Sequence, residues 1–220
     1  EKPLIKSQKK MSITIKENKV IFINTLGDVT ALDTLSGRLL WQLPTQSKSI
    51  YEDAMFLKIS DMVLEDNSVF FSNNMNEFFS LDASTGILNW KQVVNSSLRP
   101  SIVNDFIFTV SEEGFLIVID SKSGKIIRST DLFDKFKINK RKKIKPTGFV
   151  LGSKKLYLST STGRLLIVDI ETGKTQSIIK IDSEKISRPI ILKQSLFVVK
   201  NNSVITVSYT HLRAHETKSY

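Results

Sequence analysis

Residues that commonly carry catalysis or hold metal ions are scarce in this chain. None of its 220 residues is Cys, and its two His residues, His211 and His215, both lie near the C-terminus. Side-chain nucleophiles are usually activated by a neighbouring base such as His, and zinc sites are built mainly from Cys and His. The sequence also contains no Gly-rich phosphate-binding loop. We therefore predict a protein that is not an enzyme and that has no catalytic, cofactor-binding or metal-binding residues.

Adjacent carboxylates are the remaining candidates for acid–base chemistry. They occur at Glu52 and Asp53 and again at Glu112 and Glu113. Neighbouring residues on a strand point to opposite faces, so neither pair could converge on one substrate atom from a strand. In a loop, such pairs are usually solvated surface charges. Function is therefore expected to come from binding surfaces.

The two His residues are discounted further because the stretch that holds them breaks the pattern of the rest of the chain. Residues 207–220 read VSYTHLRAHETKSY, which closely resembles the translation of a transposon-type sequencing adapter. We interpret 207–220 as a non-native, adapter-derived tail and exclude it from functional reasoning. A natural C-terminal tail is the alternative.

Four copies of one pattern fill most of the chain. Each copy has an apolar run, a polar break, a second apolar run that ends in Asp, and a Gly four residues after that Asp. In D-x-x-[ST]-G the Asp can accept hydrogen bonds from backbone N–H groups two or three residues on, and the Gly supplies a positive φ. The segment therefore predicts a tight hairpin turn, with a ligand role for the Asp residues as the alternative. These structural repeat residues are Asp33, Gly37, Asp82, Gly86, Asp120, Gly124, Asp169 and Gly173.

The spacing of the copies predicts the fold. The Asp-Gly motif recurs at steps of 49, 38 and 49 residues. The apolar runs have the length and the Val, Ile and Phe content of strands. With a lead strand before each copy, this gives four strands per unit of about 40–50 residues, which is typical of a β-propeller blade. We predict an all-β protein: residues 1–10 form a lead-in, and residues 11–206 form a β-propeller fragment of four full four-stranded blades plus part of a fifth.

These blades are expected to form an open arc, with no helix beyond a turn or two. The predicted strands of the first unit are residues 11–15, 20–24, 29–33 and 38–43. The lead strands of the later units are expected at 61–65, 99–103, 146–151 and 188–192, and the fifth unit continues with 196–200 and 204–207.

Positive charge is concentrated in the second half of the chain. The net charge is +10; residues 1–110 carry 11 Lys and Arg against 12 Asp and Glu, whereas residues 111–220 carry 21 against 10. Residues 135–145, KFKINKRKKIK, hold seven of these cations, including Lys140, Arg141, Lys142 and Lys143. Such a run can attract an acidic partner, nucleic acid or an anionic membrane surface. Nucleic acid is disfavoured because no aromatic or Gly-rich recognition motif accompanies the run, and a solvated connection between repeats is the simpler interpretation.

A recurring Trp connects the repeat to a known family. The patterns A-L-D-x-x-[ST]-G-x-x-x-W in residues 31–41 and L-D-A-S-T-G-x-x-x-W in residues 81–90 resemble the tryptophan-docking repeat of the pyrroloquinoline-quinone-like β-propeller family. The resemblance covers roughly residues 11–206 and implies that the rings of Trp41 and Trp90 pack between neighbouring blades. Arg128 and Ser177 replace Trp in the next two copies, so we expect those blades to dock through other apolar contacts.

Within that superfamily the chain is most similar to the C-terminal half of the BamB family. The segments LRPSIVNDFIF at 98–108, SRPIIL at 187–192 and IIRSTDLF at 126–133 carry this resemblance. It implies a non-catalytic, periplasmic scaffold lipoprotein of the outer-membrane β-barrel assembly machinery, which binds the periplasmic domains of the barrel-inserting subunit. The lipid anchor would lie upstream of Glu1. The alternative is a fragment of a quinone-dependent dehydrogenase, but no residue here matches that family's calcium-binding set or its vicinal Cys pair.

Two arginines are the preferred partner-binding candidates. Arg99 and Arg188 open equivalent lead strands, and each precedes a Pro that fixes the local backbone. Lead strands line the channel of a propeller, so we expect both residues near one channel mouth, where they could pair with acidic groups of a partner through forked hydrogen bonds. An ion pair within the chain is the alternative. Lys140, Arg141, Lys142 and Lys143 are expected to add longer-range attraction.

Overall fold

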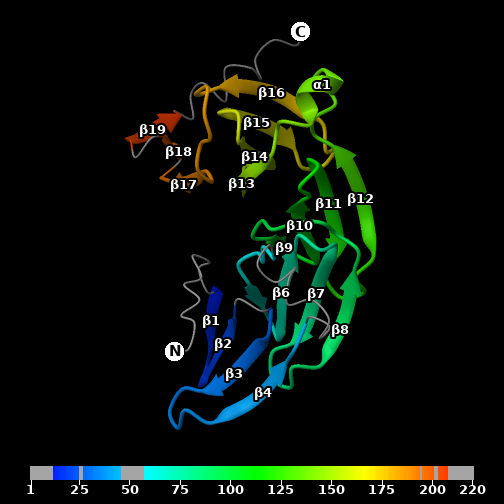
Figure 1. Ribbon diagram of the computed structural model, residues 1–220, viewed down its shortest axis with the longest axis vertical. Helices are drawn as coiled ribbons and strands as arrows, with labels where there is room; N and C mark the ends of the chain where they lie inside the picture. The colour runs from blue at the N-terminus through cyan, green and yellow to red at the C-terminus, as the bar shows by residue number, and fades with distance from the viewer. Residues whose placement is uncertain (1–11, 25–26, 46–56, 194, 201–202, 208–220) are drawn as a thin grey trace, which may run out of the picture. The chain divides into compact units, whose positions relative to one another are not determined.

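The computed structural model describes residues 12–24, 27–45, 57–193 and 195–200, together with the strand course of 203–207 (Figure 1). Antiparallel strands make up nearly all of its regular structure, as the sequence predicts. Within the described ranges the single α-helix is α1 (Ile138–Arg141), which is about one turn long. The predicted lead-in of residues 1–10 and residues 208–220 of the predicted tail lie outside the described residues.

The strands form four sheets of four and one sheet of three, so the predicted blade content is confirmed. In each of them, strands that are consecutive in sequence lie side by side. The strands are β1 (Ser12–Lys16), β2 (Lys19–Ile23), β3 (Val29–Asp33) and β4 (Leu39–Leu43); β5 (Val63–Glu65), β6 (Ser68–Asn73), β7 (Glu77–Asp82) and β8 (Leu88–Gln92); β9 (Ser101–Val103), β10 (Phe106–Val110), β11 (Phe115–Asp120) and β12 (Ile126–Asp131); β13 (Pro146–Gly152), β14 (Lys155–Thr160), β15 (Arg164–Asp169) and β16 (Thr175–Lys180); and β17 (Ile190–Leu192), β18 (Ser195–Lys200) and β19 (Ser203–Val207).

The chain divides into two compact units. The first comprises residues 1–109 and 119–125, and the second comprises residues 110–118 and 126–220. In the first unit, the blade of β1–β4 and the blade of β5–β8 share one apolar core, in which Ile21, Val29, Phe71 and Leu81 are buried. In the second unit, the fourth and fifth blades share an apolar cluster that includes Tyr157, Leu165, Ile167 and Leu196.

Three lead strands begin two residues later than the sequence predicts. β9 and β17 start after Pro100 and Pro189 rather than at the preceding Arg. In the fifth blade, the Ser187 N–H donates to the Val199 carbonyl at 2.9 Å, so the pairing slips by one residue before β17. β5 starts at Val63 because its pairing with β6 slips by one residue before that point: the Ser60 N–H donates to the Ser72 carbonyl at 2.8 Å, where the register of β5 would place Asp61. The Met62 N–H, which points away from β6, donates to the Ser12 hydroxyl of the first blade at 2.7 Å. Each of these blades therefore pairs its lead strand over only three residues.

Each D-x-x-[ST]-G segment folds as a tight turn. In the first blade, Asp33 Oδ1 accepts hydrogen bonds from the Ser36 backbone N–H and the Ser36 hydroxyl, both at 2.7 Å, and the Gly37 N–H donates to the Asp33 carbonyl at 2.9 Å. Gly37 has φ +69°, and the glycines at the same position of the other three turns have φ between +71° and +73°. The hydrogen bond from the Ser36 hydroxyl lowers the pKa of Asp33, so the turn carboxylate stays ionised in mildly acidic solution.

The two Trp rings lie against the turns of the blades that follow them. Trp41 Nε1 donates to the Ala83 carbonyl at 3.3 Å, and a Cβ atom added at Gly86 would lie 2.5 Å from Trp41 Cε3. Trp90 Nε1 donates to the Ser121 carbonyl at 2.9 Å. A Cβ atom at Gly124 would lie 2.6 Å from Trp90 Cδ2, so both turns need Gly for close approach as well as for backbone conformation.

The third blade docks differently from the sequence-based expectation of apolar contacts. Arg128, which occupies the Trp position, donates from its two terminal nitrogens to the carbonyls of Ile170 and Glu171 in the turn of the fourth blade. Ile170 follows the turn Asp by one residue, as Ala83 and Ser121 do in their turns. A guanidinium group has several donors and a long stem, and it therefore reaches the same kind of carbonyl that an indole N–H reaches in the first two blades.

We expect Trp41→Ala and Trp90→Ala each to lower the free energy of unfolding by about 2–4 kcal/mol, because each ring is only partly buried and each loses packing together with one hydrogen bond. Urea denaturation measures the change. Intrinsic fluorescence at the emission maximum of fully hydrated indole in the folded protein would contradict the docked positions.

Gly37 and Gly86 provide a matched test of the docking contact. Both have a positive φ, so Ala at either position carries a similar backbone cost of about 1–2 kcal/mol. Among the described atoms, nothing lies within 4 Å of a Cβ at Gly37, whereas a Cβ at Gly86 would overlap the Trp41 ring. Gly86→Ala should therefore be the more destabilising substitution, by roughly 1–3 kcal/mol. Equal shifts of the denaturation midpoint would argue against close contact.

We expect the forked geometry of the Arg128 guanidinium, rather than its charge, to stabilise the contact with the fourth blade. Arg128→Lys keeps the charge but cannot serve two carbonyls from one plane, so we expect it to lose most of what Arg128→Ala loses, about 1.5–3 kcal/mol. Thermal unfolding of the three proteins gives the comparison. A Lys variant as stable as the wild type would show that charge alone holds this contact.

Candidate interaction surfaces

Arg188 lies across the fourth blade, within the second unit. Its lead-strand position is equivalent to that of Gly148, and a Cβ atom at Gly148 would lie 2.4 Å from Arg188 Cβ. Arg188 Nε donates to the Phe149 carbonyl at 3.0 Å, and the residue is half-buried. Gly148 has no side chain and therefore leaves room for the aliphatic part of Arg188. The hydrogen bond to the Phe149 carbonyl then holds the Arg188 side chain against the fourth blade.

Arg99 occupies the equivalent position of the third blade but has a different environment. Its side chain is exposed, and no hydrogen bond or ion pair joins it to another of the described residues. The preceding blade has Asp61 at the position of Gly148. Asp61 is exposed, and no ion pair joins it to Arg99. Arg99 is therefore presented to solvent directly before the buried Pro100, which holds its backbone.

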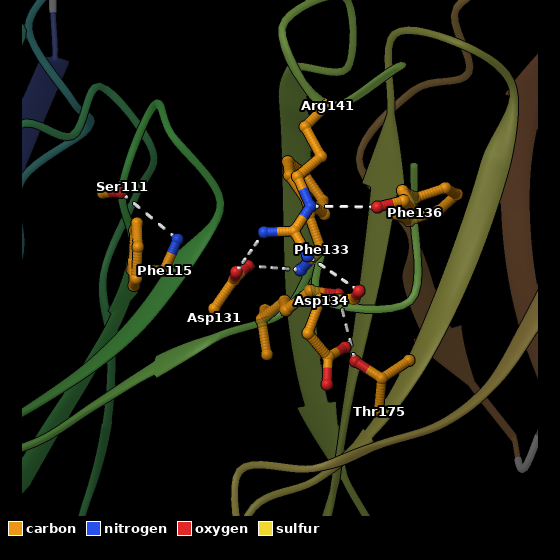
Figure 2. A network of polar contacts seen from close by, with 9 residues as sticks. Ser111, Phe115, Asp131, Phe133, Asp134, Phe136, Arg141 and Thr175 are labelled. Carbon is orange, nitrogen blue, oxygen red and sulfur yellow. Dashed lines mark hydrogen bonds and ion pairs between the residues drawn. The ribbon is translucent and has the colours of Figure 1, made fainter. Parts of the chain in front are cut away.

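Arg141, in the basic run, is engaged within its own connection between β12 and β13. Figure 2 shows its guanidinium between the side chain of Asp131 and the carbonyl of Phe136. It pairs with Asp131 Oδ2 at 2.7 Å and donates to the carbonyls of Phe136 at 3.0 Å and Asp134 at 2.7 Å. These three contacts close the segment between Asp131 and Arg141 into a compact loop. Arg141 therefore orders the loop, and the exposed charge comes from its neighbours.

Apolar residues pack at both ends of the connection between β12 and β13. Leu132 and Phe133 are fully buried, and Ile144 is nearly so. The Phe133 ring covers Gly114, where an added Cβ would lie 2.3 Å from Phe133 Cδ2, and it meets the ring of Phe136 edge-on at 5.8 Å between centroids. Burial of these side chains keeps the loop against the second unit.

Between Phe136 and Pro146 the same connection exposes five lysines to solvent. Lys140, Lys142 and Lys143 are exposed, as are Lys137 and Lys145. Ile138, the first residue of α1, is 74% exposed, and no residue of this helix is buried. Among the described residues, none of these five lysine ammonium groups makes an ion pair. The structure thus combines an exposed aliphatic side chain with five lysines that make no ion pair to the part of the chain it describes, which the sequence run alone did not reveal.

A cleft in the first unit was not foreseen from the sequence. Its volume is about 450 Å³, and it lies between the turns of the second and third blades. Phe70 and Ile102 supply apolar lining, and Glu65, Asp66 and Asp105 supply carboxylates. Lys122 pairs with Asp105 at 2.8 Å, and this hydrogen bond raises the pKa of Lys122. No short motif could predict the cleft, since its lining comes from separate turns.

The described residues contain no group of three or more His, Cys, Asp or Glu side chains placed to hold a metal ion. They also contain no helix with the length and apolar character needed to span a bilayer.

Solved structures share the fold at low sequence identity. BamB from Moraxella catarrhalis superposes with a TM-score of 0.69 at 18% identity, over 90% of this chain and 60% of that chain. The β-propeller domain of Cps50 (Swd1) from Myceliophteria thermophila gives a TM-score of 0.69 at 15% identity, over 92% of this chain and 66% of that one. The computationally designed Ika8 protein gives 0.59 at 13% identity, over 92% and 72%. The chain therefore spans about 60% of the length of the Moraxella protein, and these matches establish the propeller fold.

Sequence comparisons locate the chain within the propellers. A search of curated proteins found no match. The family model described as outer membrane protein assembly factor BamB matches residues 3–130, which is more than half of the chain. That range includes the docked Trp41 and Trp90 and the first three D-x-x-[ST]-G turns. On this match, the chain belongs to the BamB family of pyrroloquinoline-quinone-like β-propellers.

Proposed function

We propose that this protein is a non-catalytic scaffold of the machinery that assembles β-barrel proteins in the outer membrane. The observation that carries the proposal is the match of residues 3–130 to the family of the outer membrane protein assembly factor BamB. The family relation supports a periplasmic location at the outer membrane and a protein partner. The periplasmic domains of the barrel-inserting subunit are the partner that we propose.

The proposed contact centres on Arg99. A guanidinium group that is exposed and joined to no other described residue can form two parallel hydrogen bonds with a carboxylate of a partner, and such charge-assisted pairs are among the stronger polar contacts. Pro100 restricts the backbone next to it, so less conformational freedom is lost on binding. Arg188 has a different proposed role from Arg99, because its Nε already donates to the Phe149 carbonyl. We propose that it shapes the rim of its own blade.

The experiment is co-purification of the assembly machinery with the intact protein at matched expression. We expect Arg99→Glu to weaken association by tenfold or more, since it removes one partner of a charge pair and adds repulsion. Arg188→Glu should weaken association less and should also lower stability. Arg38→Glu is the matched control, because Arg38 is also an exposed arginine of the first unit and the change in net charge is the same.

The possible outcomes distinguish a failure of the proposed Arg99 contact from a failure of the proposed scaffold function. Unchanged association of Arg99→Glu would remove this residue from the interface. An equal loss of association in Arg38→Glu would show that the effect comes from the change in net charge and not from a contact of Arg99. Failure of the wild-type protein to co-purify with the machinery, or reduction of a dye by the protein in the presence of pyrroloquinoline quinone, would overturn the scaffold assignment itself.

A further inference from the structure

The loop of residues 137–145, here called the basic loop, is an ordered platform. Arg141 ties it to Asp131 and to two backbone carbonyls, and buried Ile144 fastens its end. A partner that binds the loop therefore meets side chains on a backbone that is already ordered, and less entropy is lost on binding than for a disordered segment.

The exposed side of the basic loop carries positive charge that no ion pair among the described residues offsets. Lys137, Lys140, Lys142, Lys143 and Lys145 are exposed and without ion pairs among the described residues. The carboxylate of Asp131 is already paired with Arg141, so it does not offset these lysines. Lys135 is directed elsewhere, to the carbonyl of Thr175. Asp134 is an exposed carboxylate next to the loop, so the five lysines leave a local surface of net positive charge on a chain whose net charge is already +10.

Ile138 adds an exposed apolar side chain to this charged segment. Its side chain is 74% exposed, and the flanking positions are Lys137 and Asn139. Segments that lie in the interface of a bilayer combine apolar side chains, which enter the boundary of the acyl chains, with ammonium groups that meet anionic headgroups. Ile138 and the lysines of the basic loop supply one group of each kind.

The same observations disfavour an acidic protein as the occupant. Recognition of particular carboxylates usually relies on the planar fork of Arg, and the one Arg of the run is turned inward. Lysines on flexible stems are compact, hydrated charges without such fixed geometry. They suit a diffuse anionic surface, for which proximity matters more than orientation.

We propose that the basic loop binds the surface of an anionic phospholipid bilayer, with Ile138 in the interface and the five lysines against the headgroups. This inference does not depend on the proposed function, since it involves neither Arg99 nor a protein partner. Each lysine near such a surface strengthens binding about fivefold at low salt, and a single inserted aliphatic side chain adds to this.

The test is flotation of the intact protein with vesicles of phosphatidylcholine mixed with phosphatidylglycerol, beside vesicles of phosphatidylcholine alone. We expect binding to the anionic vesicles only, and a decrease as salt is raised. The triple variant Lys140→Glu, Lys142→Glu, Lys143→Glu should bind on the order of 100-fold more weakly or worse. Circular dichroism and thermal unfolding of the same samples establish that the variants are folded.

The matched control reverses three exposed lysines of the same chain outside the loop: Lys125→Glu, Lys174→Glu and Lys180→Glu. It changes the net charge by the same amount and should retain most of the binding. Ile138→Ser leaves the charge unchanged and should weaken binding several-fold, whereas Ile138→Trp should strengthen it and shift the Trp emission to shorter wavelength on vesicles.

Three results would overturn the proposal. The first is absence of wild-type binding to anionic vesicles. The second is an equal loss of binding in the control triple variant, which would assign the effect to net charge. The third is binding of soluble polyglutamate that displaces the protein from vesicles while Ile138→Ser behaves as wild type, which would reassign the basic loop to an acidic protein.

Discussion

Contact between one blade and the turn of the next is the interaction on which the described structure depends. A side chain on the outermost strand crosses to the following blade and hydrogen-bonds a backbone carbonyl just after the turn Asp. Asp and Gly make this possible together. The Asp carboxylate holds the turn in shape, and the Gly lets it take a positive φ and leaves space for the incoming ring. One short motif thus fixes both the hairpin within a blade and the approach of its neighbour.

The chemistry of the docking side chain can change while the acceptor stays. Trp90 donates to the Ser121 carbonyl and also stacks on Phe78, with 5.8 Å between ring centroids. Arg128 reaches the equivalent carbonyl of Ile170 and one more, and no aromatic ring among the described residues packs on its guanidinium. Between the fourth and fifth blades, where Ser177 holds the docking position, an apolar cluster around Tyr157 and Leu196 connects the sheets. Docking by Trp or Arg therefore requires an ordered turn with an accessible backbone carbonyl.

The blades could be predicted because their signals are local and repeated. Alternating apolar runs and turn residues lie within one hairpin, so the strand order and the D-x-x-[ST]-G turns follow from the sequence alone. The docking of Arg128 could not be predicted in the same way, because the loss of Trp indicates what is absent and not what replaces it. Its acceptors, Ile170 and Glu171, lie more than 40 residues away and become neighbours only after two blades have formed.

The candidate binding residues show the same limit. Arg99 and Arg188 share the sequence context Arg-Pro at equivalent lead positions, yet one is exposed and the other half-buried. The difference comes from the preceding blade, which offers Gly148 to Arg188. Within the basic loop, the sequence indicates charge but cannot show that Arg141 folds back onto Asp131 and leaves the lysines outside. In this fold, the exposure of a surface side chain therefore depends on contacts with neighbouring segments and not on its local sequence alone.

A double-mutant cycle between Trp90 and Gly124 tests the docking contact most directly. Trp90→Ala, Gly124→Ala and the double variant would be compared by urea denaturation. If the ring rests on the turn, the penalty of the added methyl group falls once the ring is removed, and the two changes should couple by about 1 kcal/mol or more. Additivity within about 0.5 kcal/mol would contradict the account, because it would mean that the ring and the turn do not touch.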